Sequence, residues 1–231
     1  MQPDHTRHWT PADLARRIDH TLLKADATPA QIDTLCDEAI EHGFATVCIN
    51  PRFVPQAHNR LAASPVGVTT VIGFPLGATT AQTKAYEAAQ ALAAGADELD
   101  VVIPLGLALS GDLAGVCRDL EPLCQARQSE NPNALVKVIL ETAALPENTI
   151  VNLCRALAGL PIDFLKTSTG FHPAGGATVA AVQLLATHRQ GRKIKAAGGI
   201  RSLDFALQLL NAGADRLGAS ASLDLLAQLR P

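Results

Sequence analysis

Two lysines stand in short apolar runs, each just before a polar, glycine-containing turn. Lys166 lies within residues 163–170 (DFLKTSTG), and Lys195 lies within residues 193–199 (KIKAAGG). A lysine at the end of a buried strand is partly removed from water, which disfavours the ammonium form and lowers the pKa of the amine. A neutral amine attacks carbonyl carbons and forms Schiff bases. The two runs together indicate a lysine nucleophile with a second cation beside it.

The elements that would position these lysines alternate along the chain. Short β-rich runs are separated by longer amphipathic runs rich in Ala and Leu, which is typical of βα units. The expected strands span residues 17–21, 45–50, 67–73, 98–103, 135–141, 163–168, 193–197 and 216–219. Eight such units in 231 residues predict a closed (β/α)8 barrel, an α/β fold with parallel strands. An open, doubly wound sheet has the same local pattern, but the Gly-x-Gly-x-x-Gly and Walker fingerprints that often mark one are absent.

Capping signals place helices between these strands. Thr80 is expected to begin a helix that Gly95 ends, and Ser202 to begin one that ends before Gly213. Pro146 is expected in the first turn of a third helix, which Gly159 closes. No linker interrupts the pattern, so residues 1–231 are expected to form a single domain, with residues 1–11 as a peripheral arm or short helix.

Alternation along the strands brings charged side chains to one face. If these faces point into the barrel, Asp100, Lys166 and Lys195 meet in the lumen, where Asp19, Lys137 and Glu141 can join them. Charges there need partners, because an isolated buried charge costs several kcal/mol. The pattern has two interpretations: a catalytic cluster, or a salt-bridge network that serves stability alone. For Lys137 and Asp19 a supporting role in the network is favoured over a direct chemical one.

A phosphate site is expected after the last two strands. Gly198-Gly199 precedes the helix that Ser202 caps, and Gly218-Ala219-Ser220 precedes the final helical run. Glycines let backbone N–H groups approach an anion, and helix N-termini add a favourable dipole without a basic cluster. Barrels often hold phosphate at this position. The alternative interpretation is that both segments are simply tight turns.

Composition excludes several other classes of function. The formal net charge is −3, with no basic block, and aromatic residues make up only 3% of the chain, so nucleic-acid and membrane-surface binding are not expected. No apolar run is long enough for a signal peptide or a membrane span. The five cysteines are read as reduced thiols of a cytoplasmic protein, and the scattered histidines predict no metal site.

Motifs along nearly the whole chain resemble the deoxyribose-phosphate aldolases, a family of class I aldolases. The segments that carry the resemblance are residues 18–24 (IDHTLLK), 47–51 (VCINP), 71–77 (VIGFPLG), 95–100 (GADELD), 137–142 (KVILET), 166–171 (KTSTGF), 195–201 (KAAGGIR) and 217–220 (LGAS). The ordered pair KTSTG and KxxGGxR is the most specific of them.

The resemblance implies a TIM barrel that reversibly joins acetaldehyde and glyceraldehyde 3-phosphate into 2-deoxyribose 5-phosphate, with no cofactor. By motif position, Lys166 is the Schiff-base lysine, Lys195 the cation that lowers its pKa, and Asp100 the carboxylate that relays protons. Thr169, Gly170, Gly198, Gly199, Gly218 and Ser220 bind the phosphosugar. The expected partners are these small molecules, and the resemblance is compatible with a homo-oligomer.

Two departures from the family pattern bear on activity. Some members carry a helpful tyrosine at the C-terminus, whereas this chain ends in Leu229-Arg230-Pro231. Members often read Gly-Ser-Ser where this chain has Ala219-Ser220-Ala221, so one hydroxyl near the phosphate is missing. Two rival functions stay open at this point: another barrel lyase or isomerase acting on a phosphosugar, and a barrel that binds a phosphorylated ligand without catalysis.

Overall fold

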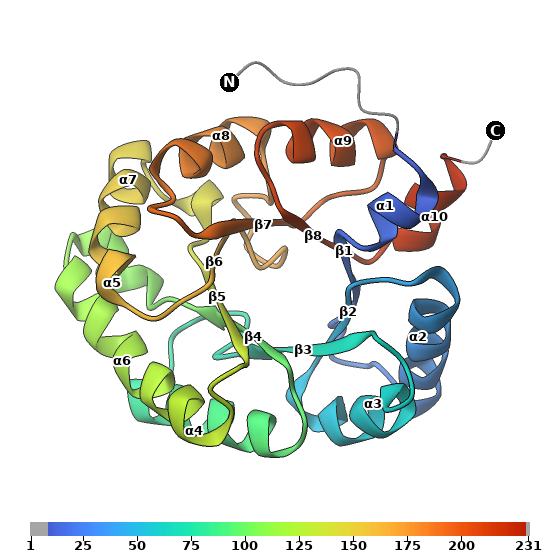
Figure 1. Cartoon of the computed structure of the whole chain (residues 1–231). Coiled ribbons are helices and arrows are strands. Elements are labelled where there is room, and N and C mark those ends of the chain that lie inside the picture. Colours follow the sequence, from blue (N-terminus) through green and yellow to red (C-terminus); the bar gives the residue numbers. More distant parts are fainter. Residues whose placement is uncertain (1–8, 230–231) are drawn as a thin grey trace.

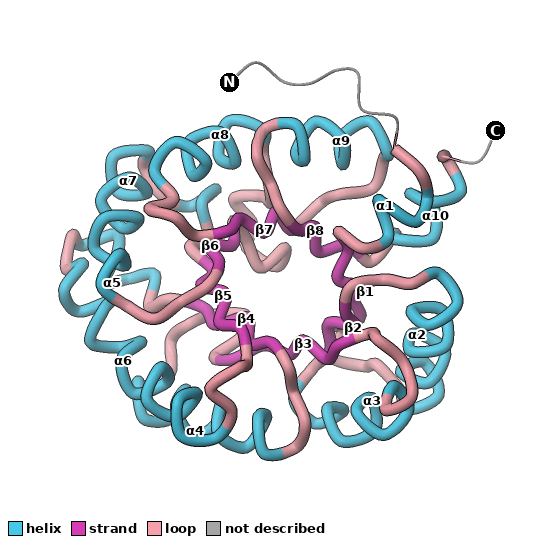
Figure 2. Tube along the Cα trace, viewed as in Figure 1, coloured by secondary structure: helices cyan, strands magenta, loops and turns pink. Residues whose placement is uncertain are grey.

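The computed structural model describes residues 9–229, and their eight parallel strands form one closed barrel. Each strand pairs with the next in chain order, and β8 closes the ring on β1. Looking down the barrel, the strands form a central ring that the helices surround (Figures 1 and 2). The expected (β/α)8 barrel is confirmed, and the open doubly wound sheet is ruled out by the β1–β8 pairing.

The strands are β1 (Ile18–Leu22), β2 (Thr46–Ile49), β3 (Gly67–Ile72), β4 (Glu98–Val102), β5 (Leu135–Ile139), β6 (Phe164–Lys166), β7 (Lys193–Ala197) and β8 (Arg216–Ala219). The α-helices are α1 (Pro11–Ala15), α2 (Pro29–His42), α3 (Val54–Leu61), α4 (Ala81–Ala93), α5 (Leu105–Ser110), α6 (Leu113–Glu130), α7 (Glu147–Ala156), α8 (Val179–His188), α9 (Leu203–Asn211) and α10 (Ser222–Ala227). Short 3₁₀ turns cover Pro51–Phe53, Thr142–Ala144 and Leu157–Gly159.

Local sequence signals set the helix ends. The Thr80 and Ser202 side chains accept hydrogen bonds from backbone N–H groups three residues on, so α4 and α9 begin where the capping signals predict. Pro146 precedes α7, but the helix ends at Ala156 and tightens into a 3₁₀ turn that reaches Gly159. Of the expected N-terminal arm, residues 1–8 lie outside the described part of the chain, and α1 begins at Pro11.

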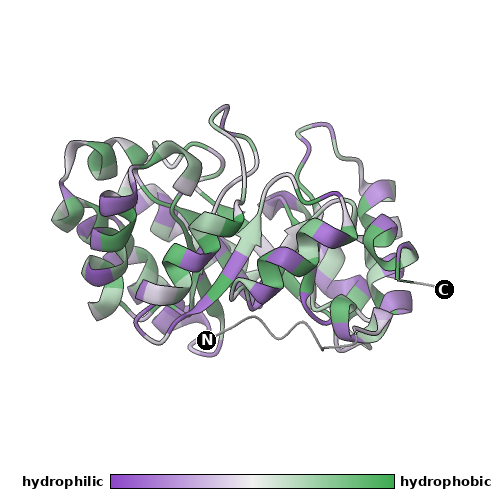
Figure 3. Ribbon diagram, turned by 90° about the horizontal axis from the view of Figure 1, so that it is seen from above, coloured by the Kyte–Doolittle hydropathy of each residue, from purple (hydrophilic) through white to green (hydrophobic). Residues whose placement is uncertain are grey.

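The apolar core lies between the barrel and the helices. Figure 3 shows helices that carry both hydrophobic and hydrophilic residues, as expected when one face of each helix packs on the sheet. Strand residues that point outward, such as Val136, Val138 and Leu165, are fully buried in this layer. The lumen is different, because Asp19, Asp100 and other charged residues are fully buried there. Within residues 9–229 no helix is long and apolar enough to span a membrane.

Strand β6 is shorter than expected, and this shapes the site. The sequence predicts a strand over residues 163–168, but the ladder ends at Lys166. The Thr167 hydroxyl donates to the Ala197 carbonyl and accepts from the Ala197 N–H, so the chain stays fixed to β7 while it leaves the sheet. Lys166 therefore sits at the last position of a strand, directly below the loop that covers the barrel.

The turn after β3 gives a test of the fold. Gly77 has φ +66°, and a Cβ there would lie 2.0 Å from the Ile103 carbonyl oxygen. Gly111 has a similar φ of +82° but nothing within 4 Å of its Cβ position. Both alanine variants pay the cost of a left-handed backbone, about 1–2 kcal/mol. We expect Gly77→Ala to lose roughly 2 kcal/mol more than Gly111→Ala in urea unfolding, because only Gly77 also clashes. Equal losses of unfolding free energy in the two variants would show that the turn at Gly77 relaxes to remove the clash.

Candidate active site

A network of charged side chains fills the barrel lumen. Three carboxylates, Asp19, Glu98 and Asp100, face four cations, Lys137, Lys166, Lys195 and Arg216. Asp100 is central: its Oδ2 lies 2.6 Å from both the Lys166 and the Lys195 amines, and its Oδ1 lies 2.8 Å from the Lys137 amine. Strand register brings these groups together, because Asp100 pairs with Lys137 across β4 and β5, and Lys166 with Lys195 across β6 and β7.

The network holds one more cation than carboxylate, and Lys166 is the cation with the fewest partners. Its amine contacts Asp100 alone, whereas Lys195 contacts Asp19 and Asp100, and Lys137 contacts Glu98 and Asp100. A surplus buried charge is costly, so loss of one proton from Lys166 balances the network. The neutral amine is therefore most accessible at Lys166.

The pKa directions agree with this charge balance. Burial lowers the pKa of Lys166; Asp100 opposes this shift and the positive charge of Lys195 adds to it. Burial would also lower the pKa of Lys195, but Asp100 and Asp19 together raise it above its ordinary value. Burial alone would raise the pKa of Asp100, yet Lys137, Lys166 and Lys195 hold it well below its usual range. The resting site thus contains an ionised Asp100 and a protonated Lys195 beside the most acidic of the three lysines.

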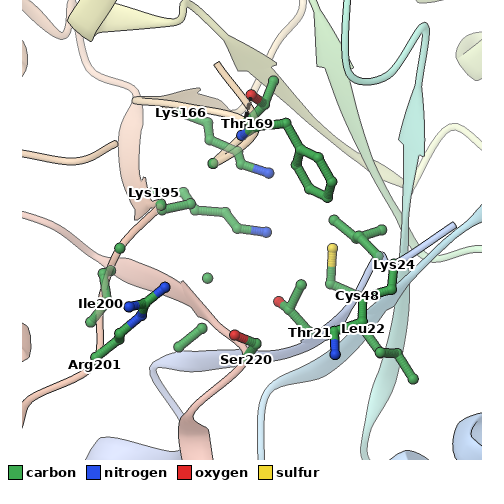
Figure 4. A pocket seen from close by; sticks show the side chains of 18 residues that line it. Thr21, Leu22, Lys24, Cys48, Lys166, Thr169, Lys195, Ile200, Arg201 and Ser220 are labelled. Carbon is green, nitrogen blue, oxygen red and sulfur yellow. Dashed lines mark hydrogen bonds between the residues drawn. The ribbon is translucent and has the colours of Figure 1, made fainter. Parts of the chain in front are cut away.

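A pocket of about 250 Å³ opens above the network at the C-terminal ends of the strands. Its floor carries Lys166 and Lys195, whose amines point into the same space, with the Cys48 thiol facing them (Figure 4). Burial raises the pKa of the Cys48 thiol, which keeps it neutral. Leu23, Cys48 and Val71 form a small apolar cluster with Phe74 beside the charged floor. The pocket thus places two lysine amines beside an apolar surface.

The residues expected to bind the phosphosugar all line this pocket. They are Thr169, Gly170, Gly198, Gly199, Gly218 and Ser220. Gly170 and Gly198 pack so closely that a Cβ on Gly198 would lie 3.1 Å from the Gly170 Cα. Gly199 has φ +79° and open space around it. Ser220 lies across the pocket from the lysines (Figure 4). The turns therefore leave room for a ligand to approach backbone N–H groups.

Sequence reasoning missed three groups that the structure brings to the site. Arg201 and Lys24 line the pocket, so the expected anion site has cations nearby after all. Arg216 joins the lumen network through Asp19 and Glu98. Both pocket cations lie in segments that carry the family resemblance, just beyond the C-terminal ends of β1 and β7. Their place after a strand was the available signal.

Other sequence expectations have mixed outcomes. Asp19 and Lys137 lie in the lumen network, as expected. Glu141 is buried but does not reach the lysines; its carboxylate binds Thr169 instead.

Comparison with known proteins decides the family. Residues 14–227 match the family described as DeoC/LacD family aldolase. The chain belongs to this family. It is 46% identical over 217 residues to the deoxyribose-phosphate aldolase of Carboxydothermus hydrogenoformans, covering 94% of this chain and 95% of that protein. It is 47% identical over 222 residues to that of Micrococcus luteus, covering 94% and 96%. The tetrameric deoxyribose phosphate aldolase of Aeropyrum pernix matches with TM-score 0.88 and 35% identity, over 95% of this chain and 92% of that one.

The family assignment confirms the resemblance found in the sequence. The protein is a DeoC/LacD aldolase, a carbon–carbon lyase on a TIM barrel, and a purely non-catalytic binding barrel is ruled out. In such barrels the catalytic groups lie at the C-terminal ends of strands, which is where Lys166 and the pocket are found.

The influence of Lys195 on Lys166 can be measured without any assay of the enzyme. Lys195→Leu removes a neighbouring ammonium, so we expect the pKa of Lys166 to rise and the amine to react only at higher pH. Reductive methylation with formaldehyde and cyanoborohydride, followed by peptide mass spectrometry, reports the pH at which Lys166 becomes reactive. Lys193→Leu, an exposed position on the same strand, is the control. An unchanged Lys166 profile in a folded Lys195→Leu protein would show that Lys195 has no electrostatic role.

Proposed function

We propose that this aldolase reversibly cleaves 2-deoxyribose 5-phosphate into acetaldehyde and glyceraldehyde 3-phosphate through a Schiff base on Lys166. The observation that carries this proposal is a buried lysine at the floor of the pocket, in a network with one surplus positive charge, touching a single carboxylate. The relatives that are 46% and 47% identical are deoxyribose-phosphate aldolases, which supports the same substrate.

The chemistry begins with the neutral Lys166 amine. It attacks C1 of the open-chain sugar, and loss of water gives an iminium, which withdraws electrons from C2. Removal of the C3 hydroxyl proton then breaks the C2–C3 bond: the electron pair moves to C2 as an enamine, and C3 becomes the aldehyde carbon of glyceraldehyde 3-phosphate. Protonation of the enamine at C2 and hydrolysis release acetaldehyde and restore the amine. The iminium is the electron sink, so the reaction requires no cofactor.

Asp100 and Lys195 are suited to moving the protons. Asp100 is ionised and contacts both lysines, so it can accept a proton directly or through water. Lys195 stays protonated because Asp100 and Asp19 raise its pKa, so it can stabilise an oxygen that develops negative charge. Their shared contact on Asp100 Oδ2 makes the three groups one unit.

The phosphate end is assigned to the opposite side of the pocket. Backbone N–H groups of Gly170, Gly198 and Gly199 and the Ser220 hydroxyl can donate to phosphate oxygens there, and Arg201 adds a positive charge. Substrate and products are small water-soluble molecules, which fits action in the cytoplasm by one barrel domain that spans the chain. A homo-oligomer is compatible with this assignment.

The nucleophile can be tested by trapping. We expect Lys166→Ala to lower kcat by at least about a thousandfold and to abolish the adduct that borohydride reduction forms with acetaldehyde or the phosphosugar. Mass spectrometry of peptides from the unaltered enzyme should place the adduct on Lys166. An adduct on Lys137 or Lys195 would disprove the assignment, and a folded enzyme that cleaves the sugar without any adduct would disprove the class I mechanism.

Phosphate recognition can be separated from chemistry through Arg201. A hydrogen bond to a charged group contributes about 1.5–3 kcal/mol, so we expect Arg201→Leu to raise KM for 2-deoxyribose 5-phosphate by about tenfold or more. KM for unphosphorylated 2-deoxyribose should change far less. Arg155→Leu, an exposed position on α7, is the matched control. Equal losses with both sugars would place the phosphate elsewhere.

A further inference from the structure

Glu141 is an unusual residue at the end of β5. It has φ +58°, a left-handed conformation that side chains disfavour, and its side chain is almost fully buried. Backbone hydrogen bonds join the residues on either side of Glu141 to β6 and the residue after it. The Leu140 N–H donates to the Lys166 carbonyl, and the Thr142 N–H donates to the Thr167 carbonyl. Strain of this kind persists only where the surroundings enforce it. The local structure therefore turns Glu141 toward the loop that follows β6.

The Glu141 carboxylate holds that loop through Thr169. The Thr169 hydroxyl donates to it at 2.6 Å, and the Thr169 N–H donates to both carboxylate oxygens at 3.2 and 3.3 Å. The same hydroxyl accepts the Phe171 N–H at 3.1 Å. A chain of hydrogen bonds thus runs from Glu141 through Thr169 to the backbone of Phe171.

Phe171 lines two cavities. Its ring packs edge-on against Phe74, with 5.2 Å between the ring centroids, although 54% of the side chain is exposed. It lines the substrate pocket and also a second cavity of about 280 Å³. The other residues that line the second cavity are mostly apolar: Pro75, Leu76, Ala78, Val102, Leu105, Glu141, His172 and Pro173. Phe171 is the only residue among 9–229 that lines both.

We propose that Phe171 is the partition that limits the length of the acceptor aldehyde, and that Glu141 is the positioning residue that holds this partition through Thr169. The proposal rests on the proposed function, since the acceptor is the aldehyde whose carbonyl carbon is attacked by the enamine on Lys166. With the partition in place, the pocket admits short or phosphorylated acceptors. Without it, the second cavity extends the pocket and accepts an unphosphorylated acceptor with a linear alkyl chain. Each methylene buried there favours the longer acceptor by about fourfold.

A purely structural role for these residues predicts a different result. Loss of stability or of general loop order lowers activity with every acceptor alike. A partition changes the ratio between long and short acceptors, because only the long ones reach the second cavity. The informative measurement is therefore made on the aldol reaction in which acetaldehyde is the donor. It is the ratio of kcat/KM with hexanal as acceptor to kcat/KM with propanal as acceptor.

The experiment compares two variants of Phe171 and two variants of Glu141 with one control variant. We expect Phe171→Ala to raise the hexanal-to-propanal ratio by about tenfold or more, with Phe171→Leu in between. Leu109→Ala removes an equally exposed apolar side chain that lines neither cavity and should leave the ratio unchanged. Glu141→Gly keeps the left-handed backbone but loses the carboxylate, so the ratio should rise several-fold. Glu141→Gln keeps one acceptor oxygen for Thr169 and should return the ratio to within about twofold of the unaltered enzyme.

Borohydride trapping of acetaldehyde on Lys166 runs beside each assay. If the adduct forms in Phe171→Ala and Phe171→Leu but the ratio stays constant, Phe171 is no partition and the inference is overturned. If Glu141→Gly and Glu141→Gln leave the ratio equally unchanged while Phe171→Ala raises it, the positioning role of Glu141 is overturned. Absence of the adduct from the unaltered enzyme would overturn the proposed function itself, and this inference with it.

Discussion

One carboxylate shared by three lysines holds together the charged lumen of this barrel. Asp100 is fully buried, and an unpaired carboxylate charge there would destabilise the fold. The amines of Lys137, Lys166 and Lys195 balance this charge. The same contacts make the lysines unequal, because Lys137 and Lys195 have further carboxylate partners and Lys166 has none. A surplus positive charge in a closed network is relieved most readily at its least supported member. The pairing of buried charges therefore leaves the ammonium form of Lys166 less stabilised than those of Lys137 and Lys195.

The barrel can hold such a network because its apolar core lies outside the lumen, between the strands and the helices. Every strand presents one face to the helices, and this layer buries residues such as Val136 and Leu165. The lumen is then free to hold charges, provided that register aligns them. Pairing of Asp100 with Lys137 and of Lys166 with Lys195 fixes that alignment in the backbone, so a one-residue slip of β4, β5, β6 or β7 would turn a charge into the apolar layer. Positioning of the site and stability of the fold are thus the same requirement.

The sequence was informative where one strand alone determines an outcome. Alternation was enough to point Asp100, Lys166 and Lys195 into the lumen, and capping residues set the start of α4 and α9. It failed where several strands must be placed first. Arg216 joins the network only because the barrel closes β8 onto β1, and Glu141 leaves the network only because its backbone turns left-handed beyond β5. The eight βα units predicted closure of the barrel, but neither the register at which β8 meets β1 nor a positive φ at a glutamate has a sequence pattern.

The segment from Lys166 to Phe171 shows how closely different tasks can lie along one chain. Lys166 ends β6, and its backbone carbonyl accepts a hydrogen bond from the Leu140 N–H, so this lysine is anchored in the sheet. The Thr167 hydroxyl then makes two hydrogen bonds to the Ala197 backbone on β7. These bonds fix the end of the strand independently of the loop that follows it. Only after this anchor does the chain form the turn that faces the pocket. A change in the loop can therefore alter the wall of the pocket while the Lys166 amine keeps its contact with Asp100.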